Sequence, residues 1–261
     1  DLPHPNTLLY EALDASGAVV SAWRVRSIGG GYLEDDTGPI GPREDLVYPV
    51  RGIREAMALC EERGWTFWEL VEDRERDLWG RLPAIWEAMK AAIRRGLETD
   101  ESRLPGSLKM PRKAPSIFAR ARSLDVPHRD IALLSAYALA VAEENAAAGI
   151  IVTAPSCGPA GVLPAVLYYF SRHKEVPERD ILRALATAGL FGSVIRANAS
   201  ISGAEVGCQG EIGSACAMTA AAASQILGGS LQQIEYAAEM GIEHHLGLTC
   251  DPVEGYVQIP C

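Results

Sequence analysis

The chain has 261 residues, of which 48% are hydrophobic, and its formal net charge is −10. That composition supports a substantial buried core, and the acidic balance argues against nucleic acid, which is bound by basic patches. Six cysteines in a chain of this length do not form a disulfide scaffold.

No charged segment followed by an apolar segment opens the sequence, so no secretory signal is expected. Two long uncharged stretches, 146–171 and 212–234, are interrupted by proline and glycine or are rich in alanine and polar residues. A membrane span needs about 20 strongly apolar residues, so these stretches predict buried helices. We expect a cytoplasmic protein with reduced thiols and no membrane partner.

Residues 1–45 alternate β-branched and aromatic side chains around Asp14-Ala15-Ser16-Gly17, which predicts a β-hairpin. An isolated hairpin is marginally stable in water. We therefore expect this one to belong to a sheet that lies mostly outside the chain, or to pack on another subunit.

From Val50 onward the pattern is helical, with caps that mark several boundaries. Pro127 and Pro177 suit first helical turns, Gly149 and Gly228 suit helix ends, and Ser230 begins a capping box. The polar, basic segment 99–126 predicts a surface loop. Helices are expected at 51–63, 67–78, 82–98, 127–148, 160–174, 178–197, 211–227 and 231–245. The fold class is therefore mainly α with a short N-terminal β-hairpin.

Three cysteines lie in segments marked by glycine or proline, where we expect loops. Cys250 follows Cys208 by 42 residues, and Cys261 follows Cys250 by 11, so no pair forms the CxxC spacing of a zinc finger. Thiols that meet only after folding suit a cluster with three protein ligands and one open iron. Spacing alone leaves open that they are small buried hydrophobes. Cys60 and Cys216 fall in helical patterns and are expected in the core.

Polar residues near these cysteines are candidates for binding a small zwitterion. The turn containing Ser156, Cys157 and Gly158 precedes a predicted helix and offers N–H groups to a carboxylate; a tight turn with an inert thiol fits equally well. His244, at the end of the last predicted helix, is the local candidate for a catalytic base, although a capping role is also open. The short polar stretch before Cys208 could bind substrate or satisfy loop backbone; it contains Asn198, Ser200, Ser202 and Glu205.

No lysine follows Lys174 and no arginine follows Arg196. A pyridoxal-phosphate enzyme needs a Schiff-base lysine and a phosphate cradle, and none of the four lysines lies in such a motif. We therefore expect no pyridoxal phosphate.

Several segments in order resemble the catalytic domain of the bacterial iron–sulfur L-serine dehydratases (L-serine ammonia-lyases). They are SIGGGYLEDD, LPGSLKMPRKA, ALAVAEENAAAG, IVTAPSCGPAGVLPAVL, ANASISGAEVGCQGE and EHHLGLTCDPVEGYVQIPC. The resemblance implies that residues 1–45 end an N-terminal α+β domain and that 46–261 form a helical catalytic domain, which continues further in family members.

The resemblance further implies that Cys208, Cys250 and Cys261 hold a [4Fe-4S] cluster and that L-serine loses water to give pyruvate and ammonia. The family's N-terminal domain carries a Ser-Ser-Ser-His-Thr stretch near the substrate, which is absent from this sequence. We expect a homo-oligomer, a dimer, or a pairing with a separate N-terminal domain. Two alternatives stay open: an iron–sulfur L-cysteine desulfidase, and a structural or sensor module holding iron–sulfur or zinc.

Overall fold

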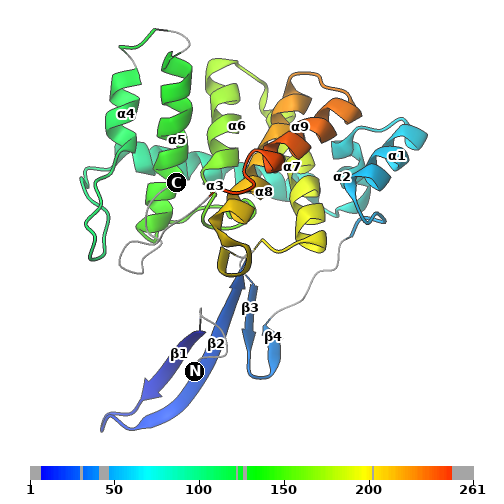
Figure 1. Cartoon of the computed structure of the whole chain (residues 1–261). Helices are drawn as coiled ribbons and strands as arrows, with labels where there is room; N and C mark the ends of the chain where they lie inside the picture. The colour runs from blue at the N-terminus through cyan, green and yellow to red at the C-terminus, as the bar shows by residue number, and fades with distance from the viewer. Residues whose placement is uncertain are drawn as a thin grey trace.

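The computed structural model describes residues 7–29, 32–40, 47–121, 123–125, 128–201 and 203–248. In that part of the chain a small antiparallel sheet precedes a helical body (Figure 1). The strands are β1 (Thr7–Leu13), β2 (Val19–Gly29), β3 (Tyr32–Asp35) and β4 (Gly38–Ile40). The helices are α1 (Ile53–Arg63), α2 (Phe67–Arg74), α3 (Leu78–Glu98), α4 (Ala114–Ala121), α5 (His128–Ala146), α6 (Val162–His173), α7 (Glu178–Asn198), α8 (Gly203–Ile226) and α9 (Leu231–Glu243).

The helical body has α8 near its middle. Helix α8 packs against α6, α7 and α9, and it also contacts β2. On one side α4, α5 and α6 run next to one another with α3 crossing behind them, and on the other side lie α1 and α2 (Figure 1). A residue in the first half of α8 can therefore meet the turn between α5 and α6.

The core is continuous through the helical body and contains large side chains from several helices. Trp86, Leu167 and Leu190 are almost fully buried, and the rings of Phe67 and Phe191 meet edge to face at 5.3 Å. Helix α8 contributes a stripe of buried alanines that lets neighbouring helices approach closely. The alanine-rich stretch within 212–234 is therefore part of a buried helix, as predicted.

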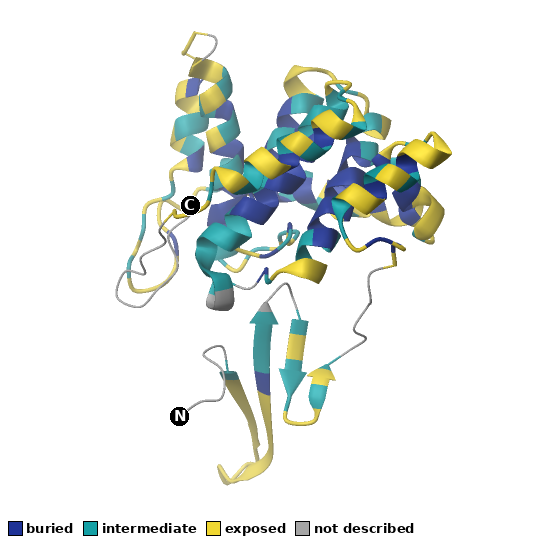
Figure 2. Ribbon diagram, turned by 45° about the vertical axis from the view of Figure 1, so that its right-hand side comes forward, coloured by how far each residue is buried: buried dark blue, intermediate teal, exposed yellow. Residues whose placement is uncertain are grey.

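The sheet has the order β1-β2-β3-β4, so the predicted hairpin is confirmed and extended by two short strands. Figure 2 shows most of β1 and β2 exposed. Leu8 and Tyr10 on one face and Leu9 on the other are each more than half exposed. Where the sheet meets the helices, the Arg196 guanidinium lies 5.0 Å from the Tyr32 ring centroid.

Three expectations from the sequence were wrong in detail. The segment 99–126 is not all loop, because α4 lies within it. Helix α2 ends at Arg74 and α3 already begins at Leu78. Helix α8 begins at Gly203 instead of residue 211, so Cys208 lies inside a broken helix and not in a loop. The capping box of α9, formed by Ser230 and Gln233, is confirmed.

No helix in the described part of the chain is both long enough and apolar enough to span a bilayer.

Close packing of α3 on α5 depends on Gly96, which generates a stability prediction. A Cβ at this position would overlap the backbone carbonyl of Ala140. We expect Gly96→Ala to lower the free energy of unfolding by about 1–3 kcal/mol, as overpacking does. Urea denaturation measures the change.

The matched control is Gly189→Ala in α7, where a Cβ meets no atom within 4 Å. Alanine has the higher helix propensity, so this variant should be more stable than the parent by about 0.5–1 kcal/mol. Equal stability of the two variants would contradict the described α3–α5 contact.

Candidate functional site

The turn between α5 and α6 contains the Ser156-Cys157-Gly158 motif. Ser156 is buried, at 3% exposure, whereas Cys157 is exposed. The side-chain amide of Asn145, at the end of α5, donates to the Cys157 carbonyl at 3.1 Å. That hydrogen bond fixes one side of the turn to the preceding helix.

The end of α5 also holds the segment before α4. The fully buried Glu143 carboxylate accepts the backbone N–H groups of Lys113, at 2.5 Å, and Ala114, at 3.2 Å. Its neighbour Glu144 pairs with Arg112 at 3.3 Å and with Arg95 at 3.0 Å. Buried carboxylates are stable only when paired or hydrogen-bonded, so these contacts explain why consecutive glutamates are tolerated here.

Helix α8 is broken at Gly207, whose φ of 71° and ψ of 172° are outside the helical region. A positive φ of this kind favours glycine. The regular segment then begins with Cys208, whose thiol is half-buried. Backbone N–H groups in the first turn of a helix have no intrahelical acceptor, so this position suits a thiolate or a negatively charged group.

Glu211 joins the turn to α8. The Ser156 hydroxyl donates to the Glu211 carboxylate at 2.5 Å, across 55 residues of sequence. Glu211 follows Cys208 by three positions in the same helical segment, so both side chains lie on one face. The structure thus brings Ser156, Gly158 and the Cys208 segment together, as a common site requires.

Two glycines leave room for this carboxyl group. A Cβ on Gly158 would lie 3.0 Å from a Glu211 carboxylate oxygen, and a Cβ on Gly203 would overlap it. Burial raises the pKa of Glu211 because it penalises the charged form, while the Ser156 hydrogen bond acts in the opposite direction. The group is therefore biased towards holding a proton.

The two histidines after α9 have different surroundings. His244 is exposed, and its Nδ1–H donates to the Met240 carbonyl at 2.8 Å. His245 is half-buried, its Nδ1–H donates to the Gly241 carbonyl at 2.7 Å, and its Nε2 lies 3.4 Å from the Cys216 sulfur. A carbonyl can only accept, so Nε2 is free to accept the Cys216 S–H. It is His245 that contacts α8, and the role of His244 stays a prediction.

The remaining predicted residues divide into three groups. The Asn198 amide donates to the backbone carbonyls of Arg51 and Val194, each at 2.8 Å, so it fastens the end of α7. Ser200 is half-buried two residues further on. Outside the described side chains lie Ser202, Glu205, Cys250 and Cys261.

Of the three proposed cluster ligands, Cys208 lies in the described part of the chain. Among the residues that the structure describes, no group of three His, Cys, Asp or Glu side chains could hold a metal ion. Because two of the three proposed ligands lie beyond Leu248, this finding does not bear on the full set. Cys208 itself fits a ligand, since it begins a helical segment on the face that also carries Glu211. Cys60 is buried, as expected, whereas Cys216 is only half-buried.

The fold is a mainly helical domain in which the helix that carries Cys208 meets the turn before α6. Comparison with known proteins gives its family. The chain belongs to the serine dehydratase alpha chain family, whose model matches residues 21–261. It is 44% identical to an L-serine dehydratase of Streptomyces coelicolor and 42% identical to L-serine dehydratase 1 of Escherichia coli, over 99% of this chain. An L-serine dehydratase of Haemophilus influenzae is 41% identical over the same share. The chain spans 59–60% of the length of these relatives.

Sequence reasoning missed Asn145, Glu211 and the contact of His245 with Cys216. Glu211 had a detectable signal, because it lies between Gly210 and Gly213 in an apolar region without any lysine or arginine. An acidic residue in such a setting is a candidate for burial. Asn145 and His245 had no such signal, since their partners are fixed only by the fold.

The raised pKa of Glu211 predicts a pH-dependent stability difference. A raised folded-state pKa means that the folded protein loses stability as pH rises from the unfolded pKa through the folded one. The neutral amide of Glu211→Gln avoids that loss and still accepts from Ser156. We expect the variant to gain stability relative to the parent between pH 4.5 and 8, measured by urea denaturation.

Glu239→Gln, at an exposed position of α9, is the control and should show no such trend. In contrast, Ser156→Ala should lower the free energy of unfolding by about 1–3 kcal/mol at pH 8, because it leaves the half-buried Glu211 carboxylate without its hydrogen-bond donor. A Glu211→Gln variant that is less stable than the parent at pH 8 would contradict the assigned environment.

Proposed function

We propose that this chain carries the catalytic part of an L-serine ammonia-lyase, which eliminates water from L-serine and gives pyruvate and ammonia. The observation that supports it is the hydrogen bond from Ser156 to Glu211, which unites the turn and the Cys208 helix. The relatives that match over 99% of this chain are named L-serine dehydratases.

In the proposed reaction a base removes the Cα proton of serine, the Cβ–O bond breaks, and the hydroxyl leaves with a proton as water. The aminoacrylate product tautomerises to an imine, which water hydrolyses to pyruvate and ammonia. Atoms balance without an oxidant or a second substrate.

We further propose that Cys208, Cys250 and Cys261 hold a [4Fe-4S] cluster. When bound, a cluster with one open iron would supply Lewis-acid polarisation of the serine oxygen atoms. The expectation that pyridoxal phosphate is not used stays a prediction. It is consistent with Lys90, which pairs with Glu87 and Glu178, and with Lys174, which lies over the Tyr169 ring.

The turn before α6 is proposed to bind the substrate carboxylate. Backbone N–H groups near the first turn of a helix carry partial positive charge, and they could hold an anion in a region without lysine or arginine. Asn145 would keep the turn in place through the Cys157 carbonyl. Ser156 and Gly158 would then face the substrate from one side.

Glu211 is proposed to hold and pass on a proton at the carboxylate oxygen that accepts from Ser156. Burial raises the pKa of Glu211, which suits a group that takes up and gives back a proton. The base that removes the Cα proton is assigned to His244 within this chain, as the sequence suggested. A base from outside the chain is the alternative, because the relatives are longer.

The exposed apolar faces of the sheet support the expectation of a partner. A small sheet with both faces in water is marginally stable. We propose that β1 and β2 are covered by an N-terminal domain or by a second copy of the protein, giving a dimer.

The role of Glu211 in proton transfer predicts a loss of turnover without loss of fold. Glu211→Gln should lower kcat for L-serine by about 10²-fold or more, the range of general acid–base contributions. Iron content should stay at the parent level, and the melting temperature should not fall below that of the parent. Pyruvate release under anaerobic conditions measures the change, with Glu239→Gln as control. Parent-like kcat in Glu211→Gln would remove Glu211 from the reaction.

Cluster ligation predicts a specific loss of iron. In anaerobically purified protein, Cys208→Ala, Cys250→Ala and Cys261→Ala should each lose the cluster, because three thiolates are needed. Cys216→Ala should keep its iron, since Cys216 contacts His245 instead. Iron and sulfide analysis measures both. Equal iron loss in all four variants would overturn this ligand set.

Two experiments separate the alternative functions. A substrate panel distinguishes an L-cysteine desulfidase, which would release sulfide from cysteine faster than it releases ammonia from serine. Electron paramagnetic resonance of the reduced protein, titrated with L-serine, distinguishes an enzyme from a sensor module. A spectrum that does not change when L-serine is added would favour the sensor module.

A further inference from the structure

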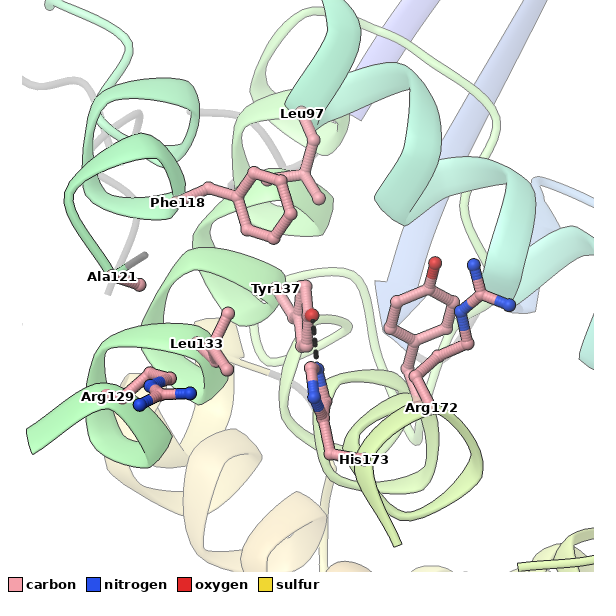
Figure 3. A pocket seen from close by; sticks show the side chains of 9 residues that line it. Leu97, Phe118, Ala121, Arg129, Leu133, Tyr137, Arg172 and His173 are labelled. Atoms are coloured by element: carbon pink, nitrogen blue, oxygen red, sulfur yellow. Dashed lines mark hydrogen bonds between the residues drawn. The ribbon is translucent and has the colours of Figure 1, made fainter. Parts of the chain in front are cut away.

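A cavity lies away from the Cys208 segment, between α3, α4, α5 and α6 (Figure 3). Its volume is about 590 Å³, within the range of sites that bind small organic molecules. It is lined by Leu97, Phe118, Ala121, Arg129, Leu133, Tyr137, Tyr168, Arg172 and His173.

The cavity occupies the far end of α6 from the Ser156 turn. The turn directly precedes α6, whereas Arg172 and His173 belong to its last turn. Twelve residues at 1.5 Å per residue place the two ends about 18 Å apart. A molecule in this cavity would therefore not occupy the proposed serine site.

The wall of the cavity is aromatic and apolar. Phe118 lies 5.9 Å from the Tyr137 ring, and Tyr137 meets Tyr168 edge to face at 4.9 Å. Leu133 is buried beside them. Such a surface favours a flat apolar group, because burial of apolar area and ring contacts both contribute.

Two arginines give the cavity a cationic rim, and in the view of Figure 3 they lie on opposite sides of the Tyr137–His173 pair. Within the described ranges, neither Arg129 nor Arg172 is joined to a carboxylate by an ion pair. The Arg129 Nε–H donates to the Leu124 carbonyl at 3.2 Å, and Arg172 lies 5.9 Å from the Tyr168 ring centroid. The terminal nitrogens of both guanidinium groups can therefore bind an anion.

Between the arginines, the Tyr137 hydroxyl and His173 Nε2 are hydrogen-bonded at 2.8 Å. Burial raises the pKa of Tyr137 to about 12, so the phenol keeps its proton. Burial lowers the pKa of His173, and the nearby Asp130 carboxylate acts in the opposite direction. Two arginines against one aspartate leave the cavity with a net positive charge.

We propose that this cavity is a second ligand site that binds a small amphipathic organic anion. The apolar body would lie against Phe118, Tyr137 and Tyr168. The carboxylate or sulfonate would face Arg172, and Arg129 on the other side of the cavity would add to the positive potential. The proposal is independent of the reaction assigned to the Glu211 site.

The test uses 2-naphthoate as the anionic probe and 2-naphthalenemethanol as its neutral counterpart, titrated into the folded protein by fluorescence and calorimetry. We expect saturable binding of one naphthoate per chain and at least fivefold weaker binding of the alcohol. Arg172→Gln should weaken naphthoate binding at least fivefold. Arg120→Gln, on the exposed side of α4 and outside the cavity, should leave it unchanged.

Leu133→Trp fills the cavity and should abolish binding of both probes, while circular dichroism checks its fold. If it fails to fold, Arg172→Gln still decides. The proposal is overturned if naphthoate does not bind saturably or if the alcohol binds equally well. It is also overturned if Arg172→Gln and the control Arg120→Gln bind naphthoate with equal affinity. Displacement of naphthoate by L-serine would overturn the separation of the two sites.

Discussion

The hydrogen bond between the Ser156 hydroxyl and the Glu211 carboxylate connects two parts of the chain that are 55 residues apart. Gly158 and Gly203 are small because the carboxyl group lies against them. Asn145 supports the turn from the other side. The candidate site thus contains a carboxyl group that lies against two glycines, at positions where any larger side chain would collide with it.

The same region illustrates how local backbone and tertiary packing combine. Gly207 interrupts α8, and the regular segment that begins with Cys208 carries Glu211 on the same face. Further along, the buried alanines of α8 allow α7 and α9 to pack closely, and His245 contacts Cys216 from the end of α9. The apolar half of the helix therefore fixes the polar half in position.

Much of the fold was predictable because helical periodicity and end signals agree. Pro177 and the Ser230 capping box mark helix starts that the structure confirms. Helix α4 was missed because it is only eight residues long, has proline as its second residue, and lies in a segment rich in proline and basic residues. The start of α8 was missed because its glycines resemble a loop, and only packing against α7 and the turn makes that segment helical.

The site was predictable in part. Ser156, Gly158 and Cys208 were singled out from the sequence, and they do lie in segments that meet. Glu211, which joins these segments, was missed. Its place between glycines in an apolar region signals burial, but its partner Ser156 is fixed only by the fold. Family membership follows from the match over residues 21–261, while cluster ligation depends on cysteines outside the described part.

The proposed function requires Ser156 and Glu211 to act as one unit in serine turnover. A double-mutant cycle on kcat/KM, with Ser156→Ala, Glu211→Gln and the combined variant, measures that coupling directly. We predict a coupling free energy of about 1 kcal/mol or more, because contacting groups of one network lose the same interaction only once. Additive effects of the two substitutions would contradict the account.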